Sequence, residues 1–475
     1  MDQLLDPVFL ITVAKIAIPL ILFQLLVVLV VMERRGAAYI QDRPGPNRAS
    51  LNLSFAALSN PDSVFALNAP ANSLRLRAFG AIFNLADAVK LLFKERFDPH
   101  FVEHKLLYGI APAIPMISGL LTPALIPWFA PISVAHAGTV ASVSGQIIDA
   151  NSGILMLFAL GSLSVYGVVL GSWASNSKFS LLGGMRASAM MISYEVSMGL
   201  AVMGMLLIAG SLSLTSVVEW QGQHVWGIVV QPLGFLLFLV AMFAECNRNP
   251  FDVAEGESEL VAGYLTEYSS VRFMTFMASE YLHMMVASAL IATVYLGGYH
   301  LLPCPLPLHG LSEAWVSLDT NWIRSNLGPV LAVLLCLTAL PVFGFAWLLN
   351  IRRVRALKRP ASDRILRARE YGFYMMLFSG LGVALIVGGA AACALIASPV
   401  LVDGVYPLWV SLIVAVVQFH VVIVKTLLLC WVFVWVRWTL PRFRYDQIMA
   451  LGWKVMLNLA LLNLMATAVI TKLVR

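Results

Sequence analysis

Residues 225–298, VWGIVVQPLGFLLFLVAMFAECNRNPFDVAEGESELVAGYLTEYSSVRFMTFMASEYLHMMVASALIATVYLGG, contain two apolar stretches, 225–245 and 271–298, on either side of a short polar loop. Each stretch reaches the length of about 20 residues that a helix needs to cross about 30 Å of hydrocarbon. Residues 245–270, which include the loop, hold six of the chain's 25 acidic residues. The pattern predicts a helical membrane protein that concentrates carboxylates beside the membrane.

Further stretches have the same character, and together they predict ten transmembrane helices. The ten lie near 8–32, 106–129, 152–175, 187–210, 225–245, 271–298, 327–349, 371–398, 408–436 and 448–473. Little polar sequence is left outside them, and a backbone in lipid must satisfy its hydrogen bonds internally. We therefore expect an all-α, polytopic membrane protein in which residues 1–475 form a single membrane bundle.

The distribution of Lys and Arg predicts the orientation of the spans. Segments on one side hold 26 of the 31 basic residues, whereas the other side holds only Arg324, Lys472 and Arg475. Because cytoplasmic loops carry the excess of Lys and Arg, both termini are expected outside. The first span follows Asp2 and Asp6 rather than basic residues, so we expect it to stay as a helix and not to be cleaved. Topology explains the basic composition, and nucleic-acid binding is not expected.

The cysteines do not form a metal-binding pattern. All five stand singly, without a C-x-x-C pair or a histidine at ligand spacing: Cys246, Cys304, Cys336, Cys393 and Cys430. A Gly-rich nucleotide-binding loop is also missing from the sequence. We expect no metal, iron–sulfur cluster or nucleotide to be bound by this chain.

Two segments follow the first span on its inner side. ERRGAAYIQDRPGPNR (33–48) alternates charges and ends in a Pro-Gly-Pro turn, which suits either a basic membrane anchor or a functional loop. FGAIFNLADAVKLLFKE (79–95) gathers apolar residues such as Ile82, Phe83 and Val89 on one helical face. We expect this second segment to be an amphipathic helix that lies in the plane of the membrane surface, although simple packing on the bundle would suit the same pattern.

Ionisable residues also occur inside the predicted spans. Glu195 lies nine residues beyond Arg186, and Glu280 lies eight beyond Arg272, so both are about 12–13 Å deep along a helix. Lys425 is expected in nearly the same layer, about 18 Å from Arg437. Placing an ionisable side chain in lipid costs free energy, so such residues are functional candidates by default. The two interpretations here are a proton relay and a structural buried ion pair. The lone histidines, His283 and His420, fit ordinary core positions on apolar helices.

Five motifs occur in the order found in one known family. They are ERRGAAYIQDRPGPN (33–47), ADAVKLLFKE (86–95), SYEV (193–196), NPFDVAEGESELVAG (249–263) and LPRFRYDQ (440–447). They resemble the H subunits of the proton-pumping NADH:quinone oxidoreductases, respiratory complex I. The resemblance covers roughly seven tenths of the chain, in the segments 1–49, 77–298 and 409–475.

The resemblance implies that the chain forms the quinone channel and the floor of the quinone chamber, and couples quinone reduction to proton translocation. The residues implied at the channel and its entrance are Arg34, Arg43, Asp87 and Arg186. The implied acidic funnel and coupling residues are Glu245, Arg248, Asp252, Glu255, Glu257, Glu259 and Glu267. The implied intramembrane proton relay is Glu195, Glu280 and Lys425, and the residues suited to partner docking are Arg442, Arg444 and Asp446. Without the resemblance, a solvated loop would explain the funnel acids, and a topology anchor would explain the last group.

The resemblance also implies the partners. Quinone is the substrate, while flavin and iron–sulfur clusters belong to other subunits. The expected neighbours are the peripheral-arm iron–sulfur and quinone-site subunits, the small membrane subunits, the antiporter-like subunits and membrane lipid. The expected location is the bacterial inner membrane, with multiple passes and both termini periplasmic.

Two segments depart from the family pattern. Residues 50–76 form an inserted loop on the cytoplasmic side, rich in Asn, Ser and Pro, which is either a tolerated insertion or a contact for another subunit. Residues 299–408 form a larger insertion with two extra transmembrane helices, so that eight helices belong to the family core. The eight basic residues at 350–370 between these two helices suit topology, anionic lipid or an acidic partner.

Three other functions compete with this interpretation. The membrane subunit of energy-converting nickel–iron hydrogenases shares parts of the acidic loop, but the full 33–47 and 440–447 motifs favour the quinone enzyme. A secondary transporter would be expected to show matched half-repeats and a substrate site at the midplane. A purely structural anchor does not account for two carboxylates at similar depth.

Overall fold

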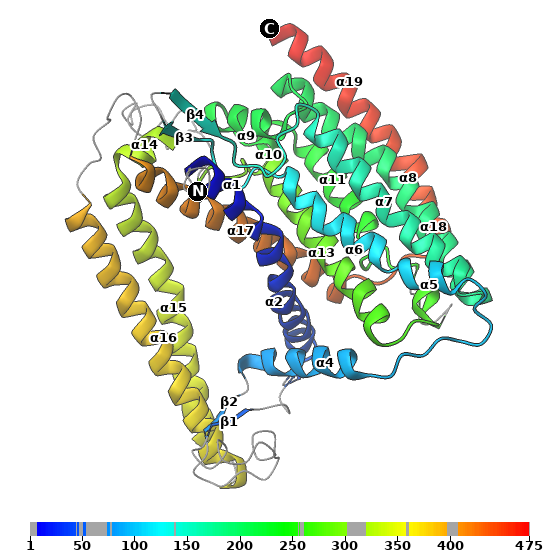
Figure 1. Ribbon diagram of the computed structural model, residues 1–475, viewed down its shortest axis with the longest axis horizontal. Coiled ribbons are helices and arrows are strands. Elements are labelled where there is room, and N and C mark those ends of the chain that lie inside the picture. Colours follow the sequence, from blue (N-terminus) through cyan, green and yellow to red (C-terminus); the bar gives the residue numbers. More distant parts are fainter. Residues whose placement is uncertain are drawn as a thin grey trace. The chain divides into compact units, whose positions relative to one another are not determined.

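The computed structural model describes residues 7–43, 45–46, 51–53, 74–76, 78–136, 139–254, 256, 261–301, 320–357, 361–396 and 407–474 (Figure 1). The chain divides into two compact units. Unit 1 comprises Met1–Gln41, Ala88–Thr320 and Ala415–Arg475, and unit 2 comprises Asp42–Asp87 and Asn321–Val414.

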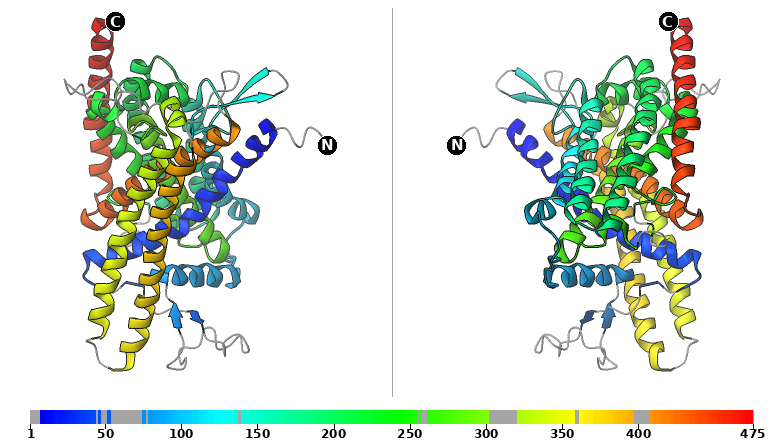
Figure 2. Two further views of the ribbon diagram at one scale, coloured as in Figure 1. Left: turned by 90° about the vertical axis from the view of Figure 1, so that its left-hand side faces the viewer. Right: turned by 90° about the vertical axis from the view of Figure 1, so that its right-hand side faces the viewer.

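Unit 1 is a helical bundle with one short β-hairpin. Its helices are α1 (Pro7–Lys15), α2 (Ala17–Ile40), α5 (Lys105–Ile110), α6 (Ala113–Leu121), α7 (Gly153–Ala174), α8 (Lys178–Ala209), α9 (Leu214–Gln223), α10 (Gly227–Val230), α11 (Pro232–Glu245), α13 (Ser270–Tyr295), most of α17 (Leu408–Thr439), α18 (Tyr445–Ala450) and α19 (Leu457–Val474). The hairpin pairs β3 (Ile132–His136) with β4 (Thr139–Val143) in antiparallel register. A six-residue π-helical segment, Leu451–Met456, joins α18 to α19, and Figure 2 shows α19 as a straight red rod, with α2 oblique to it.

Unit 2 is built around two long helices. They are α15 (Leu327–Leu357) and α16 (Ala361–Leu395), which pack along one another as a hairpin. The short helix α14 (Thr320–Ser325) precedes them, and an antiparallel ribbon of β1 (Leu51–Leu53) and β2 (Leu74–Leu76) contacts α16. Helix α4 (Ala81–Phe93) begins in unit 2 and ends in unit 1.

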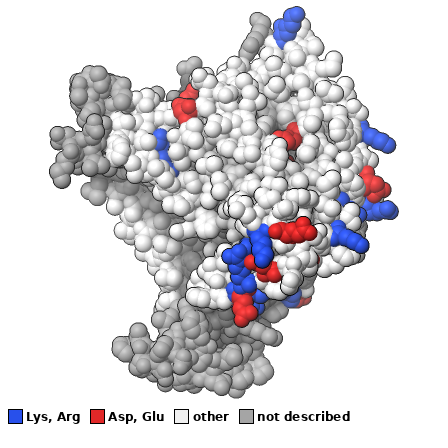
Figure 3. All heavy atoms as spheres, turned by 45° about the vertical axis from the view of Figure 1, so that its right-hand side comes forward, with Lys and Arg blue, Asp and Glu red and all other residues white. Residues whose placement is uncertain are grey.

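The all-α membrane fold is confirmed. Nine helices in the described part of the chain are long and apolar enough to cross a membrane. They are Ile11–Ile40, Lys105–Leu125, Gly153–Ala174, Lys178–Ala209, Ser270–Tyr295, Leu327–Arg355, Ala368–Ala394, Leu408–Thr439 and Tyr445–Leu473. On the face in Figure 3, most of the described surface carries no charged side chain. Charged side chains form one cluster near the lower end of the described surface, and others are spread along its right-hand side.

The fifth predicted span, 225–245, is absent from these nine because it is not one continuous helix. It is divided into α10 and the 14-residue α11 at Gln231, whose backbone (φ −128°, ψ 59°) is not helical. The following residue, Pro232, disfavours the helical conformation of the residue before it. The buried Gln231 amide bonds to α19 instead, donating to Thr467 Oγ1 (2.6 Å) and accepting from Asn463 Nδ2 (2.9 Å). The break therefore has a local cause and a tertiary one.

Helix α13 is the centre of unit 1. Of its most apolar 18-residue window, 78% is buried, against 17% for the window in Tyr445–Leu473. Around the start of α13 the core is aromatic: Tyr264 and Tyr268 each meet the ring of Phe276 edge-on. The acidic loop therefore leads directly into the most enclosed helix of the bundle.

The amphipathic segment forms helix α4, shorter than the predicted 79–95. Leu85, Val89, Leu92 and Phe93 on it are exposed, whereas Asn84 is buried. An apolar face left open in water would be unfavourable. Exposure of these side chains is consistent with a helix that meets lipid.

Candidate functional site

The described residues of the loop after α11, 246–254, 256 and 261–269, mostly pack into the protein rather than extend into solvent. Its first turn places Asn247 in the left-handed region (φ 48°), which asparagine tolerates better than most residues. Arg248 and Asp252 are buried, as are the apolar residues between and after them. At the far end of the loop, a Cβ on Gly183 of α8 would lie 2.8 Å from the Gly263 Cα. Glycine at 183 thus allows the loop and α8 to approach closely.

Arg248 lies between two buried carboxylates that are far apart in the sequence. Its Nη1 donates a hydrogen bond to Glu33 Oε2 at 3.3 Å, and its Nη2 is 4.0 Å from Glu280 Oε2. The guanidinium also stacks over the Tyr281 ring at 4.2 Å. Arg437 donates to the other Glu33 oxygen. The side chains of Arg248, Glu33 and Glu280 are only 5%, 9% and 12% exposed, so this buried charge network is shielded from water.

Glu280 is held from its other side by an aromatic hydroxyl. Tyr264, which follows the acidic loop, donates a hydrogen bond from its OH to Glu280 Oε1 at 2.7 Å. A hydrogen bond to an ionised acceptor is among the stronger ones in proteins. Glu280 therefore accepts a hydrogen bond from Tyr264 and lies beside the positive charge of Arg248.

The 440–447 segment contacts the acidic loop within this chain. Arg442 Nη2 donates to Asp252 Oδ2 at 2.7 Å, and the Phe443 amide donates to the Pro250 carbonyl at 3.1 Å. The rings of Phe443 and Phe251 lie 5.7 Å apart. Two groups that the sequence assigned to different roles, the funnel and the docking residues, are thus brought together.

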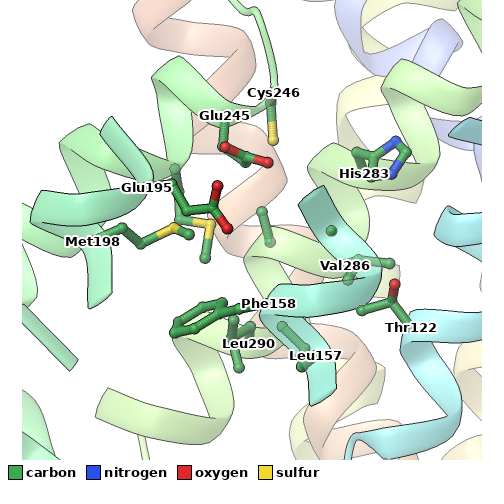
Figure 4. Close-up of a pocket in the computed structure, with 13 residues that line it drawn as sticks. Thr122, Leu157, Phe158, Glu195, Met198, Glu245, Cys246, His283, Val286 and Leu290 are labelled. Atoms are coloured by element: carbon green, nitrogen blue, oxygen red, sulfur yellow. The ribbon is translucent and has the colours of Figure 1, made fainter. Parts of the chain in front are cut away.

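Two cavities extend from this network into the bundle. The first is lined by Glu195, Glu245, Cys246, His283 and apolar residues from α7, α8, α11 and α13, and Figure 4 shows both carboxylates directed into it. It offers about 40 Å³ to the centres of water molecules; since one water needs roughly 10–15 Å³ by this measure, about three would fit. Glu195 also accepts a hydrogen bond from Ser162 Oγ.

The second cavity lies beside the first and has Glu280 in its wall. It is lined by Glu280, Tyr264, Ser279 and neighbouring residues, and it offers about 20 Å³ to water centres. Glu245, Cys246 and His283 line both cavities. Polar groups therefore line the two cavities between Glu280 and Glu195.

Lys425 corrects one expectation. It was expected at the level of Glu195 and Glu280, but its Nζ donates to the carbonyls of Leu296, Gly298 and His300 at 2.6–2.8 Å. Leu296 follows α13 sixteen residues beyond Glu280, which is about 24 Å along a helix. Lys425 therefore satisfies the C-terminal end of α13, where a cation is favourable, and lies away from the two carboxylates.

The other expected residues occupy varied positions. Arg34 lies in the last two turns of α2, Arg43 follows that helix, and Asp87 lies on α4. Arg186 is on α8 with its guanidinium 5.8 Å from the Tyr445 ring centre. The Glu267 carbonyl accepts from Tyr108 OH at 2.5 Å. Glu255, Glu257 and Glu259 lie outside the described residues.

Arg444 and Asp446 are at the surface. Their side chains are 77% and 70% exposed and lie 3.4 Å apart. An exposed pair of this kind adds little stability. Both side chains are open to contact with another molecule.

Burial changes the acidity of two groups beside the loop. It raises the pKa of Tyr268, and the neighbouring Tyr108 acts in the same direction. It also raises the pKa of the Cys246 thiol. Both groups are therefore held neutral. In the described part of the chain, no group of three or more His, Cys, Asp or Glu side chains is placed to hold a metal ion.

Several site residues were missed from the sequence. Glu33 and Arg437 were quoted only as motif or topology residues, Tyr264 as part of a loop, and His283 as a core residue. Ser162 carried no signal at all. The position of Glu33 at the start of a charged motif was the one usable signal. Its partners could not be predicted, because they lie 215 and 404 residues away in the sequence.

Comparison with known proteins identifies the family. The profile of the NADH dehydrogenase family matches residues 13–357 and 366–468, which include most of 299–408. The chain is 32% identical over 435 residues to an NADH-quinone oxidoreductase H subunit of Cytophaga hutchinsonii, covering 92% of this chain and 89% of the relative. It is 34% identical over 455 residues to an H subunit of the same enzyme in Geobacter sulfurreducens (96% and 94%) and 33% identical over 475 residues to the one in Bdellovibrio bacteriovorus (95% and 94%). The chain therefore belongs to the NADH dehydrogenase family.

Proposed function

We propose that this chain is the membrane-embedded H subunit of an NADH-quinone oxidoreductase, where it forms the quinone channel and chamber floor and couples quinone reduction to proton translocation. The observation that carries the proposal is the placement of Arg248 between Glu33 and Glu280, with cavities leading on to Glu195. A structural anchor has no use for such a set of enclosed charges. The relatives named above do not favour the hydrogenase alternative.

Proton demand at the quinone would drive the coupling. Reducing a quinone to a quinol takes up two protons, and nearby acids that interact strongly change their protonation together. Glu255, Glu257 and Glu259 on the acidic loop would respond first. Tyr264 and Arg248 join the ends of that loop to Glu280, so a change in loop charge or position alters the forces on this buried carboxylate.

The change would then pass inward through the two cavities. Glu280 faces the second cavity, Glu245 faces both, and Glu195 faces the first. Glu245 and Glu195 lie close enough to interact electrostatically, so protonating one favours ionisation of the other. Glu195 would deliver the signal, as charge or as a proton, towards antiporter-like subunits.

The remaining residues suit the quinone channel and the partner surfaces. Arg34, Arg43, Asp87 and Arg186 are proposed to line the channel and its entrance, and Glu267 to belong to the funnel. Arg444 and Asp446 are proposed to meet a peripheral subunit, since both are exposed. Arg442 has a partner in Asp252, so it would shape the docking surface as well as contact it.

The complete enzyme would supply what this chain lacks. Flavin and iron–sulfur clusters are proposed to reside in peripheral-arm subunits, with small membrane subunits and antiporter-like subunits as the other neighbours. The excess of basic residues on one side supports a bacterial inner membrane location with periplasmic termini. Residues 50–76 and 299–408 are proposed as insertions into one membrane bundle, and the eight basic residues at 350–370 as a contact for anionic lipid.

The test compares a buried carboxylate with an exposed one in the intact complex. Glu280→Gln removes the charge that Arg248 and Tyr264 hold, and Glu103→Gln changes an exposed acid on the same chain. We expect Glu280→Gln to lower inhibitor-sensitive NADH:quinone activity and proton uptake at least tenfold, with NADH oxidation by hexaammineruthenium unchanged, and Glu103→Gln to have no effect. Equal proton uptake in both variants would contradict the proposal. Nickel and hydrogen-linked activity in the purified complex would move the chain to the hydrogenase group.

A further inference from the structure

His283 lies where the two cavities meet. It lines both of them, together with Glu245 and Cys246. In the view of Figure 4, Glu245 lies between His283 and Glu195. A histidine in this position is the group whose ordinary protonation equilibrium lies nearest to neutral pH.

The hydrogen bonds around His283 fit both of its protonation states. Its Nδ1 is 2.8 Å from the Ser279 carbonyl, which can only accept, so Nδ1 carries a proton and donates. Its Nε2 is 3.2 Å from Ser118 Oγ, and the same hydroxyl is 3.0 Å from the Pro115 carbonyl. A neutral His283 accepts at Nε2 from the Ser118 hydroxyl. A protonated His283 donates from Nε2 to Ser118 Oγ, whose own proton then turns to Pro115.

The backbone of α6 is arranged to make this contact. A Cβ on Gly119 would lie 3.0 Å from Leu282 Cδ2 and 3.4 Å from His283 Cε1. The absence of a side chain there lets α6 approach α13, and it brings Ser118 to the imidazole. A histidine that only fills the core needs hydrogen-bond partners in one protonation state, whereas His283 has them in both.

Titratable groups on three helices or their ends line the same two cavities as His283. They are Glu195 on α8, Glu245 and Cys246 at the end of α11, and Glu280 on its own helix α13. The residues that α6 and α7 add to the cavity walls are uncharged. A proton on His283 would therefore be stabilised by whichever carboxylate is ionised.

We propose that His283 is the proton-carrying link between the two cavities. In the inward step, the O–H bond of a protonated Glu280 in the second cavity breaks and an N–H bond forms at His283 Nε2, directly or through one water. In the next step that N–H bond breaks and an O–H bond forms at the Glu245 carboxylate, which lies between His283 and Glu195 in Figure 4. Nδ1 keeps its proton throughout, so one proton has moved and His283 returns to its starting state. This inference rests on the proposed function and adds a residue to its relay.

The test uses His283→Asn in the intact complex. Asparagine places an amide N–H near the position of Nδ1 and keeps the bond to Ser279, but it cannot carry a proton. We expect proton uptake per NADH oxidised, measured in reconstituted vesicles, to fall about tenfold or more. We also expect the pH dependence that His283 should give the parent's rate between pH 5 and 8 to disappear. NADH oxidation by hexaammineruthenium should be unchanged.

A second variant covers the case in which His283→Asn fails to assemble. Ser118→Ala keeps the histidine and removes the hydroxyl that changes partner, so it should move the same titration along the pH axis and slow proton uptake. Parent-like proton uptake and pH dependence in either assembled variant would overturn the role of His283 and leave the proposed function standing. A parent complex without inhibitor-sensitive quinone reduction would instead overturn the proposed function.

Discussion

Replacing Arg248 with methionine should destabilise the chain far more than replacing an exposed arginine. Arg248 is 5% exposed and interacts with Glu33 at 3.3 Å and Glu280 at 4.0 Å. At an effective dielectric constant of about 20, these contacts are each worth about 4–5 kcal/mol before desolvation is subtracted. Desolvation of the guanidinium offsets several kcal/mol of this. Glu33 keeps its hydrogen bond from Arg437, and Glu280 keeps the one from Tyr264, so we expect a net loss of about 3 kcal/mol.

The assay is thermal inactivation of the purified complex. A loss of about 3 kcal/mol corresponds to about 100-fold faster inactivation if the contacts are broken at the rate-limiting step. The matched control is Arg444→Met, which removes an arginine that is 77% exposed and should change the rate less than about fivefold. In Glu33→Gln/Arg248→Met, one buried charge is removed with its partner, so part of the loss should be recovered. Equal inactivation rates for Arg248→Met and Arg444→Met would refute the reasoning.

Three further predictions test other parts of the structure. Tyr374→Phe removes the hydroxyl that accepts the Ala78 amide at 2.8 Å but keeps the ring against Phe79; hydrogen exchange in 78–87 should rise about fivefold, from a loss of about 1 kcal/mol, and unchanged exchange would count against this anchor. A Cβ at position 183 would lie 2.8 Å from backbone atoms of the loop, so Gly183→Ala should reduce the yield of assembled complex. A Cβ at position 199 on the same helix meets nothing within 4 Å, so Gly199→Ala should leave the yield unchanged; equal yields would contradict the close packing of α8. Lys425→Met leaves three carbonyls without their donor, so it should lower yield without lowering proton uptake per NADH; the reverse pattern would restore Lys425 to the relay.

Much of the fold was predictable because lipid imposes a simple rule. A helix in hydrocarbon must be apolar over about 20 residues, and this length is read directly from stretches such as 271–298. The helix break at Gln231 could not be predicted from hydropathy, because one amide side chain beside a proline changes the mean hydropathy of the stretch very little. Its hydrogen bonds to α19, more than 230 positions away, are what make the break in the fifth stretch tolerable.

Depth along a helix was a weaker guide than composition. Counting from Arg272 placed Glu280 correctly within the bundle, but counting from Arg437 misplaced Lys425. A residue count measures position along one helix axis and contains no information about tilt or about where neighbouring helices end. The carbonyls that bind Lys425 belong to the end of α13 and the turn after it.

By itself, the sequence determined that this is a helical membrane protein whose basic residues lie mostly on one side of the predicted spans, that a quarter of its acids gather in one loop, and that its motifs are those of one family. These properties depend on the composition of continuous segments. Only the tertiary structure decided which charges meet: Glu33 with Arg248 and Arg437, Arg442 with Asp252, and His283 between two cavities. Such contacts depend on the rotation and tilt of helices that are hundreds of residues apart, which hydropathy and spacing do not encode.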